Sequence, residues 1–432
     1  IRDCFDPDGD GLYESYANTW PTDNSWFSGG GCAEETAYAF TQHRAAAELA
    51  QRAGDAAAAA AHAARADQIR ASFLRTLWLE DRGHPGQSVE QGGHRRVRPD
   101  AWLYAIFCPI DAGLLSLDQA TRALYYTEWG LERQDMPWGG QRCQPSNWVP
   151  SIWSLRQLWP GDTYALALAY FQCGQPDDAW TLLRGTVPDM ALHGRVPGDL
   201  GFTVGGTDFS DCASPFGRTV VEGLFGYRPD YPKGVVRIAP QLPSHWDHAS
   251  IATPDFSLAI RGGRYDLALT RPAAVELRVP VRARKVDAVT VNGAPVRWTV
   301  EPGYGSSVVV VQMPAVTTAR VEVVTSGSVP AAPVQKHAIR LGESLRVDGM
   351  NHAFTNAGHQ VCETIVQAGE LPQRQLHKVT VRDPTADAAR AAKRLTNAPA
   401  GARWAAVEVA TQLNGDVREI FKQEYLSPRP NT

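Results

Sequence analysis

A carboxylate between two tryptophans is the part of this sequence that points most directly to chemistry. In NTWPTDNSWFSGGG (residues 18–31), Asp23 lies between Trp20 and Trp26, and three glycines follow. A carboxyl group held between aromatic faces loses solvent, which raises its pKa and lets it donate a proton. The glycines allow the backbone to approach a ligand closely. The alternative interpretation is a tryptophan-rich loop that closes the end of a helical hairpin.

A second acidic segment supplies partners for such a proton donor. Hydrolysis of a glycosidic bond needs two carboxyl groups, one that protonates the leaving oxygen and one that activates water or attacks the sugar. In GGTDFSDCASPFG (205–217), Asp208 and Asp211 precede a predicted helix. Asp208 is slightly preferred as the base because it follows a flexible glycine turn, whereas Asp211 can equally cap the helix. The candidate catalytic residues are therefore Asp23, Asp208 and Asp211.

Other aromatic and polar residues in loops are candidates for substrate binding. In DMPWGGQRCQPSNW (135–148), Trp138 stands beside two glycines and close to Arg142, as in a sugar subsite, although a structural loop is the alternative. Asp100 precedes a predicted helix, where it binds sugar hydroxyls or caps the turn. The full set of predicted substrate-binding residues is Trp20, Trp26, Glu35, Asp100, Trp102, Trp138, Arg142, Asn147 and Trp148.

A short acidic loop near the start of the chain, CFDPDGDGLYE (4–14), has part of the spacing of a calcium-binding loop. Three aspartates alternate before a glycine turn, but Ala17 occupies the position of the last EF-hand glutamate. Two interpretations stay open: calcium bound with the help of other loops, or a series of Asx turns that shapes the wall of the active site. No cofactor is required by the chemistry above. The candidate metal ligands are Asp6, Asp8, Asp10 and Glu14.

The composition is that of a globular protein and excludes some classes of partner. Of 432 residues, 44% are hydrophobic and 20% are charged, with a net charge of −4. The absence of a basic face argues against nucleic acid, and no apolar run approaches the roughly 18 residues that span a bilayer. The seven scattered cysteines fit small buried apolar side chains better than a disulfide framework. The oligomeric state cannot be read from the sequence.

Helices are predicted in the first half of the chain. Residues 33–80 read as a helical hairpin with Gly54 as the natural stop of its first arm. Loops rich in Gly, Pro and Trp separate the further predicted helices, which together indicate an α/α toroid with its active site in the loops at one end. These further helices are predicted over 109–129, 149–159, 161–174, 176–186 and 214–225.

Strands are predicted from about residue 234. Short alternating runs separated by turn residues continue to about residue 325, and Asn292-Gly293 is a strong two-residue hairpin signal. The predicted fold is mainly α: a partial (α/α)6 toroid, then an antiparallel β-sandwich, then a small mixed, β-rich carboxyl-terminal segment. The corresponding domains are 1–233 for the catalytic toroid, 234–325 for the sandwich, and 326–432 for a linker with an incomplete third domain.

The order of these features resembles that of the six-hairpin (α/α)6 glycosidases. WPTDNSW (20–26) is similar to the loop that carries the general acid in trehalases and processing α-glucosidases. QPSNWVPSIWSLRQL (144–158) is similar to a later loop of the same enzymes. The segment from FSDCASPFG to LPSHW (209–246) resembles the end of the toroid in inverting α-fucosidases and rhamnosidases. Together the resemblance covers roughly residues 5–325.

This resemblance implies a bacterial glycoside hydrolase that acts on an oligo- or polysaccharide by general acid/base catalysis with inversion. Such an enzyme is expected in the periplasm or outside the cell. In the similar enzymes the acid loop lies near the middle of the toroid, so its early position here leads us to expect that the first hairpins are missing. Two rival functions are a polysaccharide lyase on a similar toroid and a non-catalytic glycan-binding protein.

Overall fold

The computed structural model describes residues 5–14, 30–90, 94–147, 160–192, 210–329, 334–347, 350–383 and 385. In this part of the chain, 33% of the structure is helix and 42% is strand, and a large curled sheet accompanies seven α-helices. The prediction of a mainly α fold, a partial (α/α)6 toroid, is therefore wrong. The sequence pattern underestimated the strands because several short alternating runs join into long strands.

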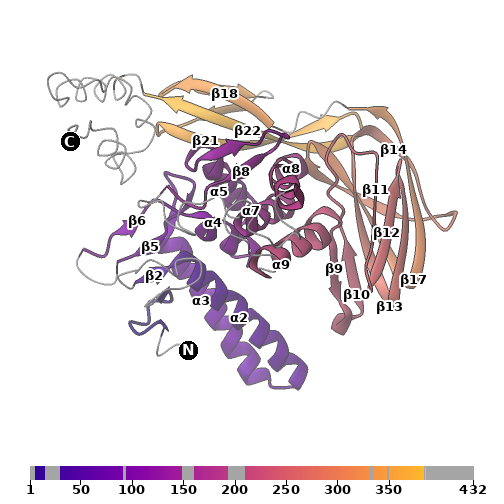
Figure 1. Cartoon of the computed structure of the whole chain (residues 1–432), viewed down its shortest axis with the longest axis horizontal. Coiled ribbons are helices and arrows are strands. Elements are labelled where there is room, and N and C mark those ends of the chain that lie inside the picture. Colours follow the sequence, from indigo (N-terminus) through magenta and orange to yellow (C-terminus); the bar gives the residue numbers. More distant parts are fainter. Residues whose placement is uncertain are drawn as a thin grey trace.

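The helices gather in the centre of the molecule, and the first two project from it as a long hairpin (Figure 1). A π-helical turn, η1 (Thr219–Leu224), follows the last α-helix, and a 3-10 turn, η2 (Tyr231–Lys233), connects the first two strands of the sheet. The α-helices are α2 (Ala33–Ala53), α3 (Ala56–Thr76), α4 (Leu103–Asp111), α5 (Leu117–Trp129), α7 (Pro160–Gln172), α8 (Pro176–Leu192) and α9 (Ser210–Arg218).

Local signals explain where these helices begin and end. Helix α2 ends at Gly54 as predicted, because that glycine adopts the left-handed conformation with φ of 79°. The helix predicted over 109–129 is instead two helices, since Gly113 takes a φ of 68° and breaks the chain's helical path. Ser116 then starts α5 with a capping box that it forms with Gln119. The predicted helix over 149–159 lies outside the described residues.

Short turns join three pairs of helices: 54–55 between α2 and α3, 112–116 between α4 and α5, and 173–175 between α7 and α8. Two long connections are described in part, 77–90 and 94–102 after α3 and 130–147 after α5. The start of α4 lies against the second long connection, because the Leu103 N–H donates to the Pro145 carbonyl at 2.8 Å. Small two-stranded ladders stiffen the long connections: β3 (Trp78–Leu79) with β4 (His84–Pro85), and β7 (Arg133–Asp135) with β8 (Gln141–Cys143).

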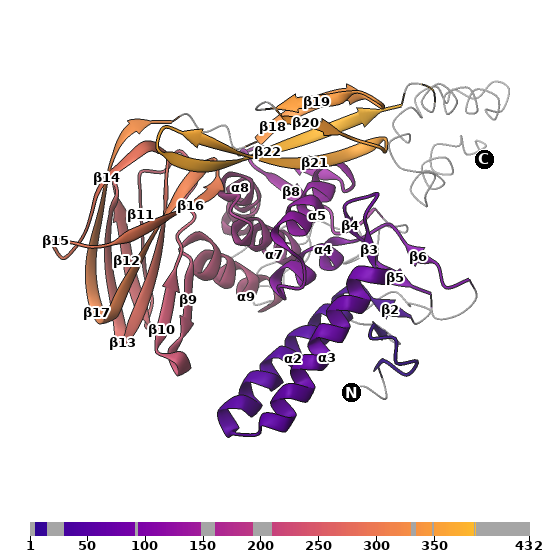
Figure 2. The same cartoon turned by 180° about the vertical axis from the view of Figure 1, so that it is seen from behind.

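Strands between residues 227 and 382 form one hydrogen-bonded sheet that curls around one side of the helices (Figures 1 and 2). Two long strands form its centre, and burial alternates along the first of them as a half-buried strand requires. The strands are β9 (Tyr227–Asp230), β10 (Val235–Ile238), β11 (His248–Ala252), β12 (Phe256–Arg261), β13 (Arg264–Val281), β14 (Ala283–Val291), β15 (Ala294–Pro295), β16 (Trp298–Tyr304), β17 (Ser306–Ser328), β18 (Val334–Arg340), β21 (Gly358–Ala368) and β22 (Leu371–Arg382). A separate ladder joins β19 (Ser344–Val347) to β20 (Met350–Ala353).

The sheet differs from the predicted antiparallel sandwich in its pairing. Most neighbours are antiparallel, but β10 pairs in parallel with β13, and β22 pairs in parallel with both β16 and β18. Strands from before and after residues 330–333 therefore share one ladder system. The Asn292-Gly293 turn is confirmed, with both residues at positive φ (52° and 81°), as a tight hairpin turn requires.

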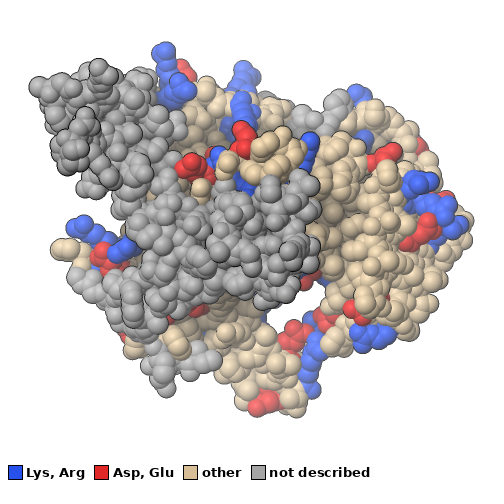
Figure 3. Space-filling model, in the orientation of Figure 1, with Lys and Arg blue, Asp and Glu red and all other residues tan. Residues whose placement is uncertain are grey.

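The surface of the described residues carries both signs of charge. On the face shown in Figure 3, acidic and basic side chains stand side by side over the curled sheet. Asp266, for example, pairs with Arg264 and Arg320, each at 2.8 Å. Among the helices that the structure describes, none has the length and apolar character needed to cross a membrane.

The carboxyl-terminal strands are fixed to the helices by a buried charge. Lys378 on β22 is only 3% exposed, pairs with Glu128 of α5, and lies 5.4 Å from the centre of the Tyr125 ring. Beside this pair, the rings of Trp129 and His359 stack at 4.6 Å. Because a buried ion must keep its partner, this contact sets how the last strands lie on α5.

We expect Lys378→Ala to destabilise the protein strongly, because it leaves Glu128 without its buried counter-ion. Breaking a buried pair typically costs about 3–5 kcal/mol. Lys285→Ala is the matched control, because Lys285 is exposed and its pair with Glu370, at 3.8 Å, is long and open to solvent. Thermal unfolding of the two variants measures the difference. Equal melting temperatures for both would show that the Lys378 pair does not hold the strands.

Candidate functional site

Several predicted site residues lie outside the described part of the chain. These are Asp23, Asp208, Trp20, Trp26 and Trp148. Asp211 belongs to the first turn of α9, but its side chain is not among those described. The separation between the predicted acid and base is therefore untested, and both assignments stay predictions.

The ends of the connection that carries Asp23 are described and lie side by side. Glu14 of β1 (Tyr13–Glu14) pairs with Gly31 of β2 (Gly31–Cys32) in an antiparallel ladder. β2 in turn pairs with β5 (Ser88–Val89), which pairs with β6 (Val97–Arg98). A side chain at Gly31 would place its Cβ 2.4 Å from that of Leu12, so only glycine allows this close approach. The connection from 15 to 30 thus begins and ends on a fixed sheet.

Glu34, in the first turn of α2, lies at the base of this connection and is completely buried. The side-chain amide nitrogen of Gln87 donates to both of its carboxyl oxygens at 3.1 Å. The Gln87 backbone carbonyl accepts from the Ala33 N–H at 3.0 Å, and its side-chain oxygen accepts from the Trp102 backbone N–H at 3.4 Å. The start of α2, the strand that begins after Gln87 and the start of α4 therefore meet at this one glutamine.

The environment of Glu34 keeps its carboxyl group protonated at neutral pH. Burial, with a smaller contribution from the neighbouring charge of Glu35, raises the pKa of Glu34 from 4.5 to about 8. Hydrogen bonding to the backbone and to the side chains of Trp102 and Gln87 opposes the increase without cancelling it. Since Glu34 is fully buried, it acts on the site by fixing the start of α2 and not by touching a substrate.

The predicted substrate-binding residues that are described fall into two groups. Trp102 is fully buried beside Glu34, and Glu35 and Asp100 are half-buried nearby in the chain. Trp138, in contrast, donates its indole N–H to the Gly185 carbonyl of α8 at 3.2 Å.

Buried polar residues hold the connection between α5 and α7. Asn147 is 8% exposed and donates from its side chain to the Gly130 carbonyl, and Arg142 is 1% exposed. This second group therefore stabilises the long connection after α5. The sugar-binding roles predicted for both groups stay predictions.

Sequence reasoning missed the two central residues of this arrangement. Glu34 was visible only as one of two acidic residues at the start of a predicted helix. Gln87 lies in the polar stretch 81–99, which carries no periodic pattern and gave no signal. A pair of glutamates three residues after a glycine run is the feature that could have pointed to Glu34.

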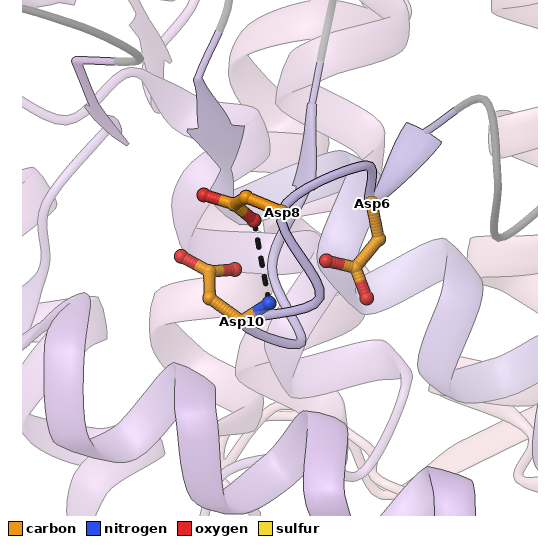
Figure 4. A group of neighbouring side chains, drawn as sticks. All are labelled: Asp6, Asp8 and Asp10. Atoms are coloured by element: carbon orange, nitrogen blue, oxygen red, sulfur yellow. Dashed lines mark hydrogen bonds between the residues drawn. The ribbon is translucent and has the colours of Figure 1, made fainter.

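The three aspartates of the acidic loop converge, as both interpretations of the pattern require (Figure 4). One oxygen from each of Asp6, Asp8 and Asp10 lies within 4.8 Å of the others. The Asp10 N–H donates to Asp8 at 3.3 Å, and the Leu12 N–H donates to Asp10 at 2.8 Å, so Asx-type turns are present. The Ser72 hydroxyl of α3 donates to the Asp10 carbonyl at 2.6 Å and supports the loop from beneath.

Arginine and a fourth carboxyl complete the surroundings of this loop. Arg65 of α3 pairs with the buried Asp6, while Arg95 pairs with Asp8 at 3.0 Å and Asp10 at 3.2 Å. Glu14 is 4% exposed, and its Oε2 atom has no hydrogen-bond partner among the described residues. Burial, together with the charges of Asp8, Asp6 and Asp10, raises the pKa of Glu14 to about 7.

Comparisons with known proteins give limited likenesses. No family model and no curated protein matches the sequence. Among solved structures, the α-L-rhamnosidase of Streptomyces avermitilis complexed with L-rhamnose is 18% identical over 74% of this chain, with a TM-score of 0.45. A structure titled "Sialidase" (14%, 60% of this chain, TM-score 0.43) and the GH78 family rhamnosidase of Bacillus sp. GL1 (15%, 60%, 0.39) are also similar. The chain spans 29%, 26% and 26% of their lengths. At these identities and TM-scores the likeness does not assign a function.

The buried carboxyl of Glu34 predicts a pH dependence of stability. The folded protein keeps this proton between about pH 4.5 and 8, whereas the unfolded chain releases it, so the free energy of unfolding falls as the pH rises through this window. Glu34→Gln cannot ionise. We therefore expect the stability of Glu34→Gln to rise relative to that of the unsubstituted protein from pH 5 to 8, by on the order of a few kcal/mol. Its melting temperature should rise accordingly.

Glu370→Gln, at an exposed glutamate in the turn between β21 and β22, is the control and should show no such trend. The measurement is thermal unfolding of all three proteins at intervals across the window. A difference between Glu34→Gln and the unsubstituted protein that stays constant with pH would mean that Glu34 is ionised in the folded state.

Proposed function

We propose that this chain belongs to a glycoside hydrolase that cleaves an oligo- or polysaccharide by general acid/base catalysis with inversion. Asp23 is the proton donor to the leaving oxygen. Asp208 or Asp211 is the base that removes a proton from the attacking water. The activity of the whole enzyme includes any part of it beyond this chain.

The observation that supports this proposal best is the buried carboxyl at the base of the Asp23 connection. A general acid must be held in a fixed place, and the ladder from Glu14 to Gly31 fixes both ends of its connection. A glycan-binding loop needs aromatic faces but has no need of a protonated, fully buried carboxyl directly beside it. The cost of burying Glu34 is consistent with a site whose geometry matters.

The second acidic segment supplies the base in this proposal. Inverting enzymes hold the two carboxyls about 6.5–9.5 Å apart, which leaves room for a water molecule. We propose this separation between Asp23 and the base.

Asp23→Asn should reduce hydrolysis by several orders of magnitude, because an amide cannot donate the proton to the leaving oxygen. The melting temperature should not change. The assay measures sugar released from a panel of aryl glycosides and polysaccharides, with Asp67→Asn on the exposed face of α3 as the control. Near-normal turnover by Asp23→Asn would remove Asp23 from the mechanism. An unsaturated product that absorbs in the ultraviolet would identify a lyase instead.

The base and the stereochemistry have a separate test. We expect one of Asp208→Asn and Asp211→Asn to lose activity as severely as Asp23→Asn, and the other to keep most of it. Proton NMR of the first product formed should show the anomer opposite to that of the substrate. A first product with the configuration of the substrate would contradict inversion and indicate a retaining nucleophile.

A further inference from the structure

We propose that His43 of α2 and His62 of α3 form a pH-sensitive contact, which joins the two arms of the projecting hairpin at neutral pH and weakens in mild acid. This inference concerns stability and does not depend on the proposed hydrolase activity. Its consequence reaches β1, because the other ring nitrogen of His43 contacts the Tyr13 hydroxyl of that strand at 3.3 Å.

The geometry of the pair allows only some protonation states. The Nδ1 atoms of the two rings lie 3.0 Å apart, and the ring planes are inclined by 42°. A hydrogen bond between two such atoms needs one that carries a proton and one that does not. The bond therefore exists in the neutral pair and in the pair with one added proton. A second added proton removes the acceptor, so the bond is lost and two like charges stand side by side.

The surroundings of the pair make the second proton costly. Among the described residues, the charged groups that act on His43 are His62 and Arg65, both on α3. Arg65 lies one turn after His62, and its charge is partly offset by the buried Asp6 with which it pairs. On the side of β1, Tyr13 is only 3% exposed. Burial, followed by the charges of His62 and Arg65, lowers the pKa of His43 from its usual value of 6.5.

The direction of the pH effect is the same for the bond and for the charges. A histidine with a lowered pKa takes up its proton less readily in the folded protein than in the unfolded chain. The contribution of the pair to stability is therefore complete above pH 6.5 and is lost as the pH falls through the lowered pKa of His43.

The first test is His62→Ala, a substitution that suits a position flanked by alanines within a helix. It removes the hydrogen bond at neutral pH and the repulsion in acid. We expect a lower melting temperature than that of the unsubstituted protein at about pH 7.5, and we expect this deficit to disappear by about pH 5. His245→Gln, at an exposed histidine between β10 and β11, is the control and should differ from the unsubstituted protein equally at both pH values. A deficit of His62→Ala that stays the same at both would overturn the proposal.

The second test follows the two rings directly, by NMR of the full chain labelled with ¹⁵N in its histidines. The pair should titrate in two separate steps, and the lower step should fall below pH 6.5. In His62→Ala the midpoint of His43 should move up toward 6.5, because the neighbouring charge is gone.

Superimposed titrations of the two rings in the unsubstituted protein would show that they share no bond and would overturn the proposal, even if His62→Ala failed to fold. An unchanged midpoint of His43 in a folded His62→Ala chain would do the same. Because every readout is titration or stability, failure of this proposal leaves the hydrolase proposal untouched.

Discussion

The side-chain amide of Gln87 is the interaction on which the candidate site depends. It is completely buried, its nitrogen donates to Glu34, and its oxygen accepts from the backbone of Trp102. A buried carboxyl is tolerated only when it is neutral or well partnered, so Glu34 and Gln87 need one another. The backbone of the same residue also bonds Ala33 and Arg98, so three segments meet at this one glutamine.

The curled sheet packs against the helices and does not form a separate domain with its own core. One apolar cluster extends from Phe40 of α2 to Val321 of β17, so the helices and the sheet share a core. Tyr304 at the end of β16 approaches the hydroxyl of Thr121 on α5 at 3.2 Å. With the buried Lys378 on the same helix, the sheet and the last strands both bear on α5. Thr121 and Glu128 are seven residues apart on α5, so one face of this helix meets both contacts.

Sequence patterns predicted the parts of this structure that have local causes. The helical hairpin ends at Gly54 and the tight turn forms at Asn292-Gly293, because both depend on residues that accept a positive φ. The predicted single helix over 109–129 failed at Gly113, where a glycine inside an apolar pattern was not read as a stop. Long strands were missed because β13 and β17 continue past irregular registers that break the alternation.

The site shows the same division between local and distant causes. The three aspartates of the acidic loop could be grouped from their spacing because they lie within one turn. Glu34 and Gln87 are 53 residues apart, and their contact depends on how the second helical pair docks on the first. A single sequence holds no local trace of such a contact. The burial of Trp102 against this pair was invisible for the same reason, although the residue itself was singled out.

The ladder between Glu14 and Gly31 has a consequence for how this protein can diversify. Since the two ends of the connection between them are fixed side by side, a change in its length or composition does not have to move the strands that bear it. Such a segment can be exchanged between related chains as a cassette, with the cost of loop closure rising only slowly with its length. The sequence of this segment could thus change while the buried contact between Gln87 and Glu34 is inherited unchanged.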